Sequence, residues 1–308
     1  MSILTEHIKS NYKAIIAMIL STLALSFAAV ASQLALKIAS TENVIIWRYA
    51  TTAILLLTGL FSFKRIDLKL NSQFHLLRSL FMVPSQIFLC IALSQLNLAI
   101  VMTIWSLSPL FITVIYSYNA NKQHRQKIIC ASIISLLGVA FLMHPSTTSI
   151  NPYLVLAILA AACNAGSQVT LTKITATDEN QHQILLKCYI YGTLCSFILI
   201  SIFHKFIPSP NHFHHNHIGK LVCILITYGI LQIINQGFRQ QAYRMSSRPK
   251  SLAPYLNLTA LFSFIISILL YPHHLSLLEL TGISCIIIGC ILAAITTTTR
   301  RNTCLTPS

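Results

Sequence analysis

Three amide side chains and a phenol occur at spacings that place them on one side of a helix. Gln232, Asn235 and Gln236 are separated by three and four residues, and Tyr228 precedes Gln232 by four, within an apolar stretch. Residues at these separations share a helical face. An amide facing lipid would lose its hydrogen bonds. We therefore expect this face to line a polar pocket that binds a substrate, or else to tie neighbouring helices together.

Two other apolar stretches carry side chains that could complete such a pocket. One contains Trp105 and Ser106, and the other contains Asn164 and Gln168. The amides and the hydroxyl could hydrogen-bond a small solute, and the indole could stack on a flat group such as a purine. Amides by themselves predict a zwitterionic or uncharged polar solute, because a buried ion needs a partner of opposite charge.

Arg48 stands inside an apolar stretch, in the sequence Trp-Arg-Tyr. An arginine at the centre of a membrane helix costs about 2.5–3.5 kcal/mol on insertion scales, so its presence needs a reason. Because it follows Glu42 closely, it could extend to the outer interface as an anchor. Alternatively, its planar guanidinium could bind the carboxylate of a substrate. On this interpretation Arg48 is the only charge well inside a span.

The composition provides a membrane-spanning framework for these residues. Hydrophobic residues make up 55% of the chain and charged residues 9%, against roughly 25% charged residues in soluble domains. A helix needs about 20 mainly apolar residues to cross a bilayer. Ten stretches meet this requirement and predict ten transmembrane helices, at residues 13–38, 43–63, 74–95, 98–118, 127–144, 151–173, 184–204, 218–240, 250–271 and 275–297.

The formal net charge of +15 could suggest nucleic-acid binding, but the positions of the basic residues indicate membrane topology instead. If the N-terminus is cytoplasmic and the spans alternate, 17 of the 21 lysines and arginines lie on the cytoplasmic side, among them Arg78, Lys187 and Arg239. This asymmetry follows the positive-inside rule. It predicts a multi-pass protein of the bacterial inner membrane with both termini in the cytoplasm and no nucleic-acid partner.

Other chemical signatures do not predict an enzyme. The nine cysteines are scattered without a CxxC pair, so neither a disulfide framework nor a zinc site is expected. The four histidines within residues 211–217 could bind a metal ion, and in a loop without a nearby cysteine or aspartate we expect such binding to be adventitious rather than functional. The six carboxylates are dispersed, and no Walker, GxSxG or HExxH motif occurs. We expect no catalytic residue, no cofactor and no resident metal.

The chain reads as one five-helix unit written twice. SLSPLF at 106–111 corresponds to NLTALF at 257–262, and KIASTE at 37–42 corresponds to KITATD at 173–178. At one constant offset, Gly138 also matches Gly289. Internal repeats are typical of secondary transporters whose inverted halves enclose a site near the bilayer midplane. We predict an all-α membrane protein built as two inverted five-helix repeats, 1–148 and 149–308, the second ending in a cytoplasmic tail.

With these features the chain resembles the drug/metabolite transporter superfamily, EamA type, over about residues 12–297. The resemblance is carried by Trp47-Arg48-Tyr49-Ala50, Leu77-Arg78, the run from Ala92 to Phe111, Gly138 and Gly289. The family usually has a Gly-Glu pair after its fourth and ninth helices, where this chain has Ala120-Asn121 and Pro272-His273. A mechanism that uses those glutamates is therefore not implied. The resemblance does imply a central cavity lined mainly by helices one, three, four, six, eight and nine.

Residues and resemblance together predict a secondary transporter that moves a small polar metabolite by alternating access. Amino acids or their derivatives are the leading substrate class, by resemblance. A nucleoside-type metabolite such as S-adenosylmethionine is an alternative, as is a lipid-linked substrate moved by a flippase. The expected partners are the substrate, the lipid bilayer and, as a further possibility, a second copy of the chain. The predicted substrate-binding residues are Arg48, Trp105, Ser106, Asn164, Gln168, Tyr228, Gln232, Asn235 and Gln236.

Overall fold

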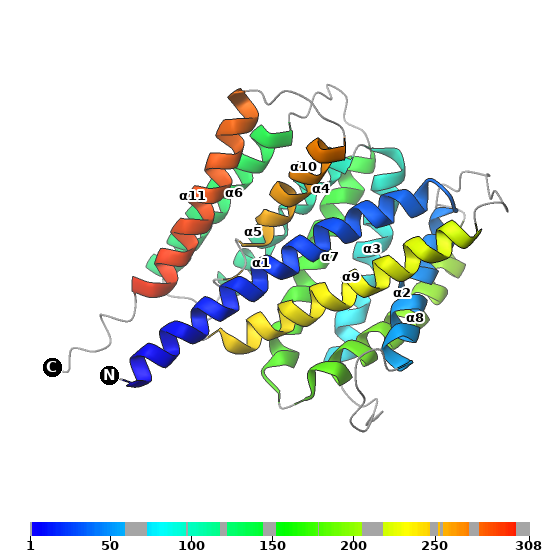
Figure 1. Cartoon of the computed structure of the whole chain (residues 1–308), viewed down its shortest axis with the longest axis horizontal. Helices are drawn as coiled ribbons and strands as arrows, with labels where there is room; N and C mark the ends of the chain where they lie inside the picture. Colours follow the sequence, from blue (N-terminus) through cyan, green and yellow to red (C-terminus); the bar gives the residue numbers. More distant parts are fainter. Residues whose placement is uncertain are drawn as a thin grey trace.

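The computed structural model describes residues 2–58, 73–96, 98–117, 122–143, 152–177, 179–204, 218–246, 252, 255–270 and 277–299. Within these ranges the chain forms helices and no strand (Figure 1). The helices are α1 (Ser2–Leu36), α2 (Thr41–Leu57), α3 (Gln73–Gln95), α4 (Leu98–Trp105), α5 (Ser108–Ser117), α6 (Lys122–Met143), α7 (Pro152–Thr175), α8 (Gln181–Phe203), α9 (Ile218–Met245), α10 (Leu258–Leu270) and α11 (Leu277–Thr299).

Five of these helices are long and apolar enough to cross a membrane. They cover Tyr12–Leu36, Gln73–Gln95, Pro152–Thr175, Gln181–Ile202 and Ile218–Met245. Their lengths are those required by a hydrocarbon core about 30 Å thick. The all-helical prediction is thereby confirmed for the described residues, and the apolar helices are those of a membrane protein.

The fourth predicted stretch, 98–118, contains two helices rather than one. α4 ends at Trp105 and α5 begins at Ser108. Pro109 has no N–H to donate to the carbonyl of Trp105, so a continuous helix would leave that carbonyl unpaired. The hydroxyl of Ser108 bonds it instead, at 2.8 Å, and also lies 3.1 Å from the carbonyl of Ala161 on α7. The break is thus both capped and tied to a neighbouring helix.

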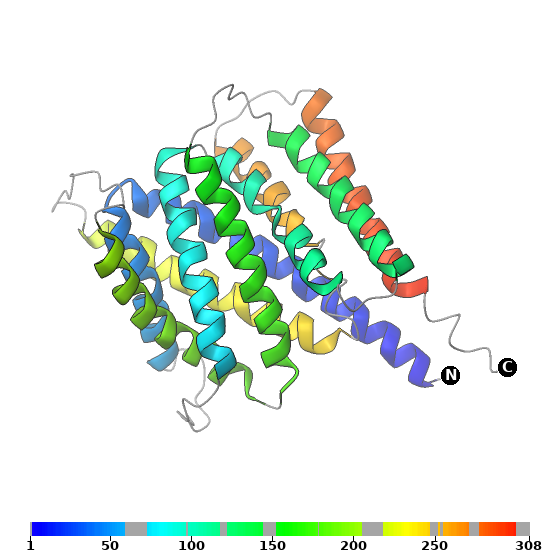
Figure 2. The same cartoon turned by 180° about the vertical axis from the view of Figure 1, so that it is seen from behind.

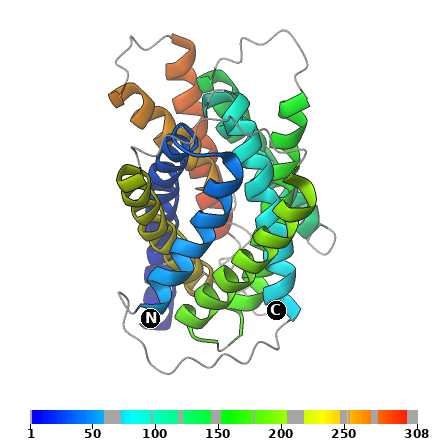
Figure 3. The same cartoon turned by 90° about the vertical axis from the view of Figure 1, so that its right-hand side faces the viewer.

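The most extensive contacts between helices join α1 to α9, α3 to α7 and α6 to α11. Figures 1 and 2 show these partners side by side. The partners run in opposite directions. Ser21 of α1 bonds Asn235 of α9 at 2.8 Å, whereas Ala31, further along α1, packs on Tyr228, which comes earlier in α9. Figure 3 shows α2 between α8 and α9, with which it makes its main contacts.

Backbones touch where α6 meets α11. A Cβ added to Gly138 would lie 2.7 Å from the carbonyl oxygen of Gly282, and one added to Gly289 would lie 2.8 Å from that of Ala131. Only glycine permits this approach, as in other close contacts between membrane helices. The contact is reciprocal, because Gly138 follows Ala131 by the same interval as Gly289 follows Gly282.

Candidate functional site

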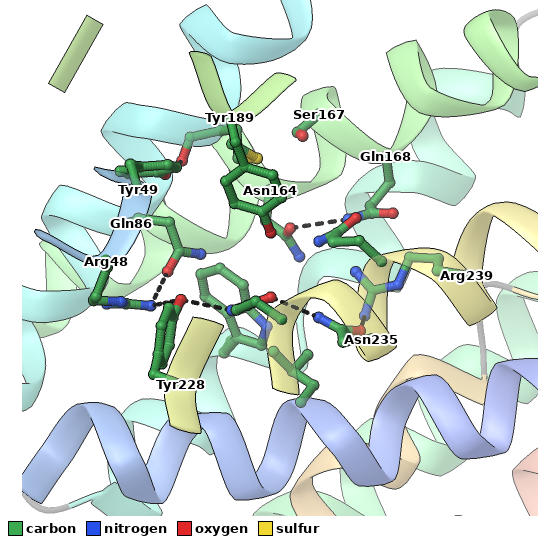
Figure 4. Close-up of a pocket in the computed structure, with 15 residues that line it drawn as sticks. Arg48, Tyr49, Gln86, Asn164, Ser167, Gln168, Tyr189, Tyr228, Asn235 and Arg239 are labelled. Atoms are coloured by element: carbon green, nitrogen blue, oxygen red, sulfur yellow. Dashed lines mark hydrogen bonds between the residues drawn. The ribbon is translucent and has the colours of Figure 1, made fainter. Parts of the chain in front are cut away.

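A polar cavity lies inside the bundle, between α2, α3, α4, α7, α8 and α9, with one residue from α1 (Figure 4). It encloses about 480 Å³ of space not filled by atoms, its mouth included. The lining residues are Leu25, Arg48, Tyr49, Met82, Gln86, Trp105, Asn164, Ser167, Gln168, Tyr189, Tyr228, Gln232, Asn235, Gln236 and Arg239.

Eight of the nine predicted site residues line this cavity, and Ser106 does not. Ser106 lies at the break between α4 and α5, where its hydroxyl donates to the carbonyl of Met102 at 2.9 Å. That carbonyl belongs to the last turn of α4, so the side chain is turned along its own helix. The structure brings the other eight together, and their role in binding a substrate stays a prediction.

One wall of the cavity is a hydrogen-bonded row along α9. Gln232 Nε2 donates to the hydroxyl oxygen of Tyr228 at 2.6 Å, and Asn235 Nδ2 donates to Gln232 Oε1 at 3.0 Å. Arg239 donates to Asn235 Oδ1 at 2.9 Å, and the hydroxyl of Ser21 on α1 donates to the same oxygen at 2.8 Å. The face therefore lines a cavity and ties two helices together at once.

Arg48 of α2 lies at the Tyr228 end of this row and is 5% exposed. Its guanidinium donates to Gln86 Oε1 and to Cys90 Sγ, each at 2.7 Å, and also to the hydroxyl oxygen of Tyr228. The guanidinium carbon stands 4.2 Å from the centroid of the Tyr228 ring, within cation–π range. The side chain is directed into the bundle, so the interpretation as an anchor at the outer interface is wrong.

The opposite wall joins α5, α7 and α9 through a second polar chain. Asn164 Nδ2 donates to Ser108 Oγ at 3.2 Å, and Gln168 Nε2 donates to Asn164 Oδ1 at 3.3 Å. The hydroxyl of Tyr243 on α9 donates to Gln168 Oε1 at 3.3 Å. The break after α4 thus positions a hydroxyl that orients the amides of α7.

Two further arginines are buried in the bundle beside Arg48, which was the only charge expected well inside a span. Arg78 is 1% exposed and donates to Gln236 Oε1 at 2.9 Å; Arg239 is 2% exposed. The alternation of spans predicts that both lie on the cytoplasmic side. Their side chains extend inward instead, where cavity amides accept their hydrogen bonds. Lys187, assigned in the same way, is also buried.

Several lining residues were not selected from the sequence. Arg239 continues the spacing of Tyr228, Gln232 and Asn235 along α9, so the helical period could have found it. Gln86 and Ser167 carried the general signal of a polar side chain in an apolar stretch. Tyr49 and Tyr189, whose ring centroids lie 6.2 Å apart, carried no such signal, because tyrosines also occur at the interfaces of membrane helices without a role in a site.

A charged cluster lies apart from the cavity, where the chain passes from α7 to α8. Glu179 accepts hydrogen bonds from Lys187 and from His75 Nε2, the latter at 2.5 Å, and Arg244 donates to its backbone carbonyl. Burial acts to raise the pKa of Glu179, but the hydrogen bonds from Lys187 and His75 outweigh it and hold the pKa below its ordinary value. The carboxylate is therefore ionised at neutral pH.

Some predictions fall outside the described residues. These are the histidines within 211–217, the pairs Ala120-Asn121 and Pro272-His273, and the cytoplasmic tail after residue 299.

Comparison with known proteins identifies a shared fold and no family. Neither a protein-family model nor a curated protein matches this sequence. Chains of solved structures do match. One, described only as "Crystal structure of protein", aligns over 96% of this chain and 98% of its own length, with a TM-score of 0.66 and 16% sequence identity. At that identity the likeness shows a shared fold alone, which extends over nearly the whole of both chains.

Proposed function

We propose that this chain is a secondary transporter of the bacterial inner membrane that carries a small polar metabolite by alternating access. The observation that carries the proposal is the convergence of polar side chains on one cavity inside an apolar bundle. Arg48, Trp105, Asn164 and Asn235 reach it from four different helices. Polar groups inside membrane proteins usually mark a substrate path.

The proposed architecture is ten spans in two inverted five-helix repeats, with α4 and α5 together forming one span. The helix contacts support it. The first helix of each repeat packs on the third helix of the other (α1 on α9, α7 on α3), and the two fifth helices, α6 and α11, pack on each other. The reciprocal contact of Gly138 and Gly289 is what a two-fold axis between equivalent helices requires.

The directions of the packed helices support inversion rather than simple duplication. Repeats related by an axis along the membrane normal would bring their fifth helices together in parallel. Here Gly138 of α6 faces Gly282 of α11, while Ala131, earlier in α6, faces Gly289, later in α11. The two helices are therefore antiparallel. The start of α1 and the end of α11 lie at the same end of the bundle (Figure 1), which supports two termini on one side of the membrane.

The decisive experiment is uptake by purified protein. The full chain would be reconstituted in proteoliposomes, incubated with a mixture of polar metabolites, and analysed by mass spectrometry of the liposome contents. We expect selective accumulation of one chemical class compared with protein-free liposomes. Folded protein that transports none of the mixture and shows no exchange of any component would contradict the proposal.

Topology has its own test. A fluorescent protein fused to the C-terminus should fluoresce, because it folds in the cytoplasm, whereas a C-terminal alkaline phosphatase should be inactive. An active phosphatase fusion would place the C-terminus in the periplasm and contradict the proposed topology.

A further inference from the structure

Three arginines are buried in this bundle without an acidic partner. Arg48, Arg78 and Arg239 are at most 5% exposed, and among the described residues both ion pairs involve Glu179, which bonds none of them. No Asp or Glu lines the cavity. A buried charge without a counter-charge is costly, and especially so in an apolar bundle. The cavity wall therefore carries positive charge that a bound anion would offset.

Each arginine donates to the oxygen of one cavity amide, in the pairs Arg48 with Gln86 (2.7 Å), Arg78 with Gln236 (2.9 Å) and Arg239 with Asn235 (2.9 Å). Arginine can only donate hydrogen bonds, so it holds each amide with the oxygen toward itself. The NH2 groups of Gln86 and Gln236 consequently point away from the guanidinium groups, and no described residue accepts from them. Figure 4 shows the Gln86 nitrogen turned away from Arg48.

The same constraint orients the row along α9 and leaves one proton free. Because Arg239 holds Asn235 Oδ1, the Asn235 NH2 donates to Gln232 Oε1 and the Gln232 NH2 donates to the oxygen of Tyr228. Arg48 donates to that oxygen as well. Tyr228 thus receives two hydrogen bonds, and no described residue accepts its own O–H. Along this row the amide oxygens of Gln232 and Asn235 already accept hydrogen bonds, and the Tyr228 O–H remains as a donor.

We propose that the cavity binds a small organic anion, a carboxylate or a phosphate, whose oxygens are held by Arg48, Tyr228 and Arg239. Arg48 uses three of its five N–H donors within the protein and Arg239 uses two, so both have donors to offer. Guanidinium pairs with either kind of anionic group through parallel hydrogen bonds. That this anion is the transported substrate rests on the proposed function; that it binds does not.

This inference replaces the expectation of an uncharged or zwitterionic solute, which considered the amides without the arginines. It also disfavours S-adenosylmethionine. The sulfonium of that molecule is a cation, and no Asp or Glu lines the cavity to pair with it. The side-chain oxygens of Gln86 and Asn235 already accept hydrogen bonds from Arg48 and Arg239.

Binding can be measured without transport, because a tryptophan lines the cavity. The chain has two tryptophans, of which Trp105 lines the cavity and Trp47 is 49% exposed. In a Trp47→Phe background, the fluorescence of purified protein in detergent reports occupancy of the cavity. The carboxylate probes are succinate, its monoamide and its diamide, which differ in charge at nearly constant size. The phosphate probe is glycerol 3-phosphate, with glycerol as its uncharged counterpart.

We expect succinate or glycerol 3-phosphate to bind, and to bind about tenfold or more tightly than its uncharged counterpart. The better-bound member of the two pairs identifies the anionic group. Arg239→Gln should weaken anion binding about tenfold, and Arg239→Lys should weaken it less, because lysine keeps the charge without the fork. Arg244→Gln, an exposed position five residues further along α9, should leave binding unchanged.

Three results would overturn the inference: no anion binds, the uncharged counterparts bind equally well, or Arg239→Gln and Arg244→Gln behave alike in folded protein. Failure of the transport proposal looks different. Anion binding that depends on Arg239, without uptake into proteoliposomes, would remove the transporter and keep the site. Uptake of an uncharged solute without anion binding would keep the transporter and remove the anion site.

Discussion

The α6·α11 contact and the wall formed by α1 and α9 join helices in an apolar medium in opposite ways. Gly138 and Gly289 bring two backbones together and leave no space between them. Between α1 and α9, Ser21, Asn235 and Arg239 make the connection through side chains. Close backbone contact permits only one arrangement of the two helices, whereas polar side chains can exchange hydrogen-bond partners. We infer that the first region holds the fold and the second serves the site, and the two should respond differently to substitution.

Asn235→Leu should have the largest effect on transport. Asn235 is fully buried and bonds Ser21, Gln232 and Arg239. Leaving buried hydrogen-bonding groups without partners costs up to about 3 kcal/mol. If that cost falls on the transport cycle, the transport rate should fall roughly a hundredfold. Abundance should stay near normal because membranes tolerate leucine well. Uptake into proteoliposomes and immunoblotting measure the two quantities.

The matched control for this variant is Thr227→Leu, an exposed position on the same helix. It should leave both quantities unchanged. If Asn235→Leu transports normally, the row along α9 is only an interhelical tie. If the variant fails to accumulate, Asn235 belongs to the same structural class as Gly289, and the distinction between the two regions collapses.

Gly289→Ala should affect stability rather than the site. The new Cβ would lie 2.1 Å from Ser135 Oγ and 2.8 Å from the carbonyl oxygen of Ala131. Overpacking of this kind costs about 1–3 kcal/mol. Gly237→Ala has nothing within 4 Å of its Cβ and should stabilise, since alanine favours a helix by up to about 1 kcal/mol over glycine. Thermal denaturation in detergent should give shifts of opposite sign; equal shifts would contradict the close contact of α6 and α11.

Arg48→Lys tests whether the cavity needs a guanidinium or only a positive charge. Lysine is a compact point charge and cannot hold Gln86, Cys90 and Tyr228 in one plane. We expect transport to fall about tenfold at normal abundance, which is the discrimination that a well-placed pair of hydrogen bonds provides. Arg244→Lys is the control. Near-normal transport by Arg48→Lys would remove Arg48 from the site.

The smallest expected effect concerns pH and lies in neither region. The pKa of Glu179 is lowered in the folded protein, so its ionised form stabilises the fold above its ordinary pKa of 4.5. That contribution is lost as the pH falls through the lowered value. The denaturation midpoint should therefore decrease from about pH 5 downward, and Glu179→Gln should flatten this decrease. An unchanged profile in the variant would mean that the bonds from Glu179 to Lys187 on α8 and to His75 on α3 do not stabilise the fold.

Periodicity and apolar length predicted the helices and the amide face of α9, because both depend on local sequence. The sequence did not predict the break between α4 and α5, because a proline in an apolar stretch can also be tolerated within a membrane helix. The burial of Arg78 and Arg239 was not predicted for another reason. Counting charges by their distance from a span end ignores side-chain direction, which only the neighbouring helices determine. Tyr49 and Tyr189 likewise reach the cavity through packing that no local pattern encodes.

If the chain is the carrier proposed above, the uncompensated arginines have a consequence for how membrane voltage would act on it. Moving one elementary charge through 100 mV is worth about 2.3 kcal/mol. A dianion held by Arg48 and Arg239 would cancel their charges, so the loaded cavity would cross the field nearly neutral. The unloaded cavity would carry its positive charge alone. The electrical work would then fall on the return of the unloaded protein, and a cell could drive or stall the cycle at that step without changing the affinity for the anion.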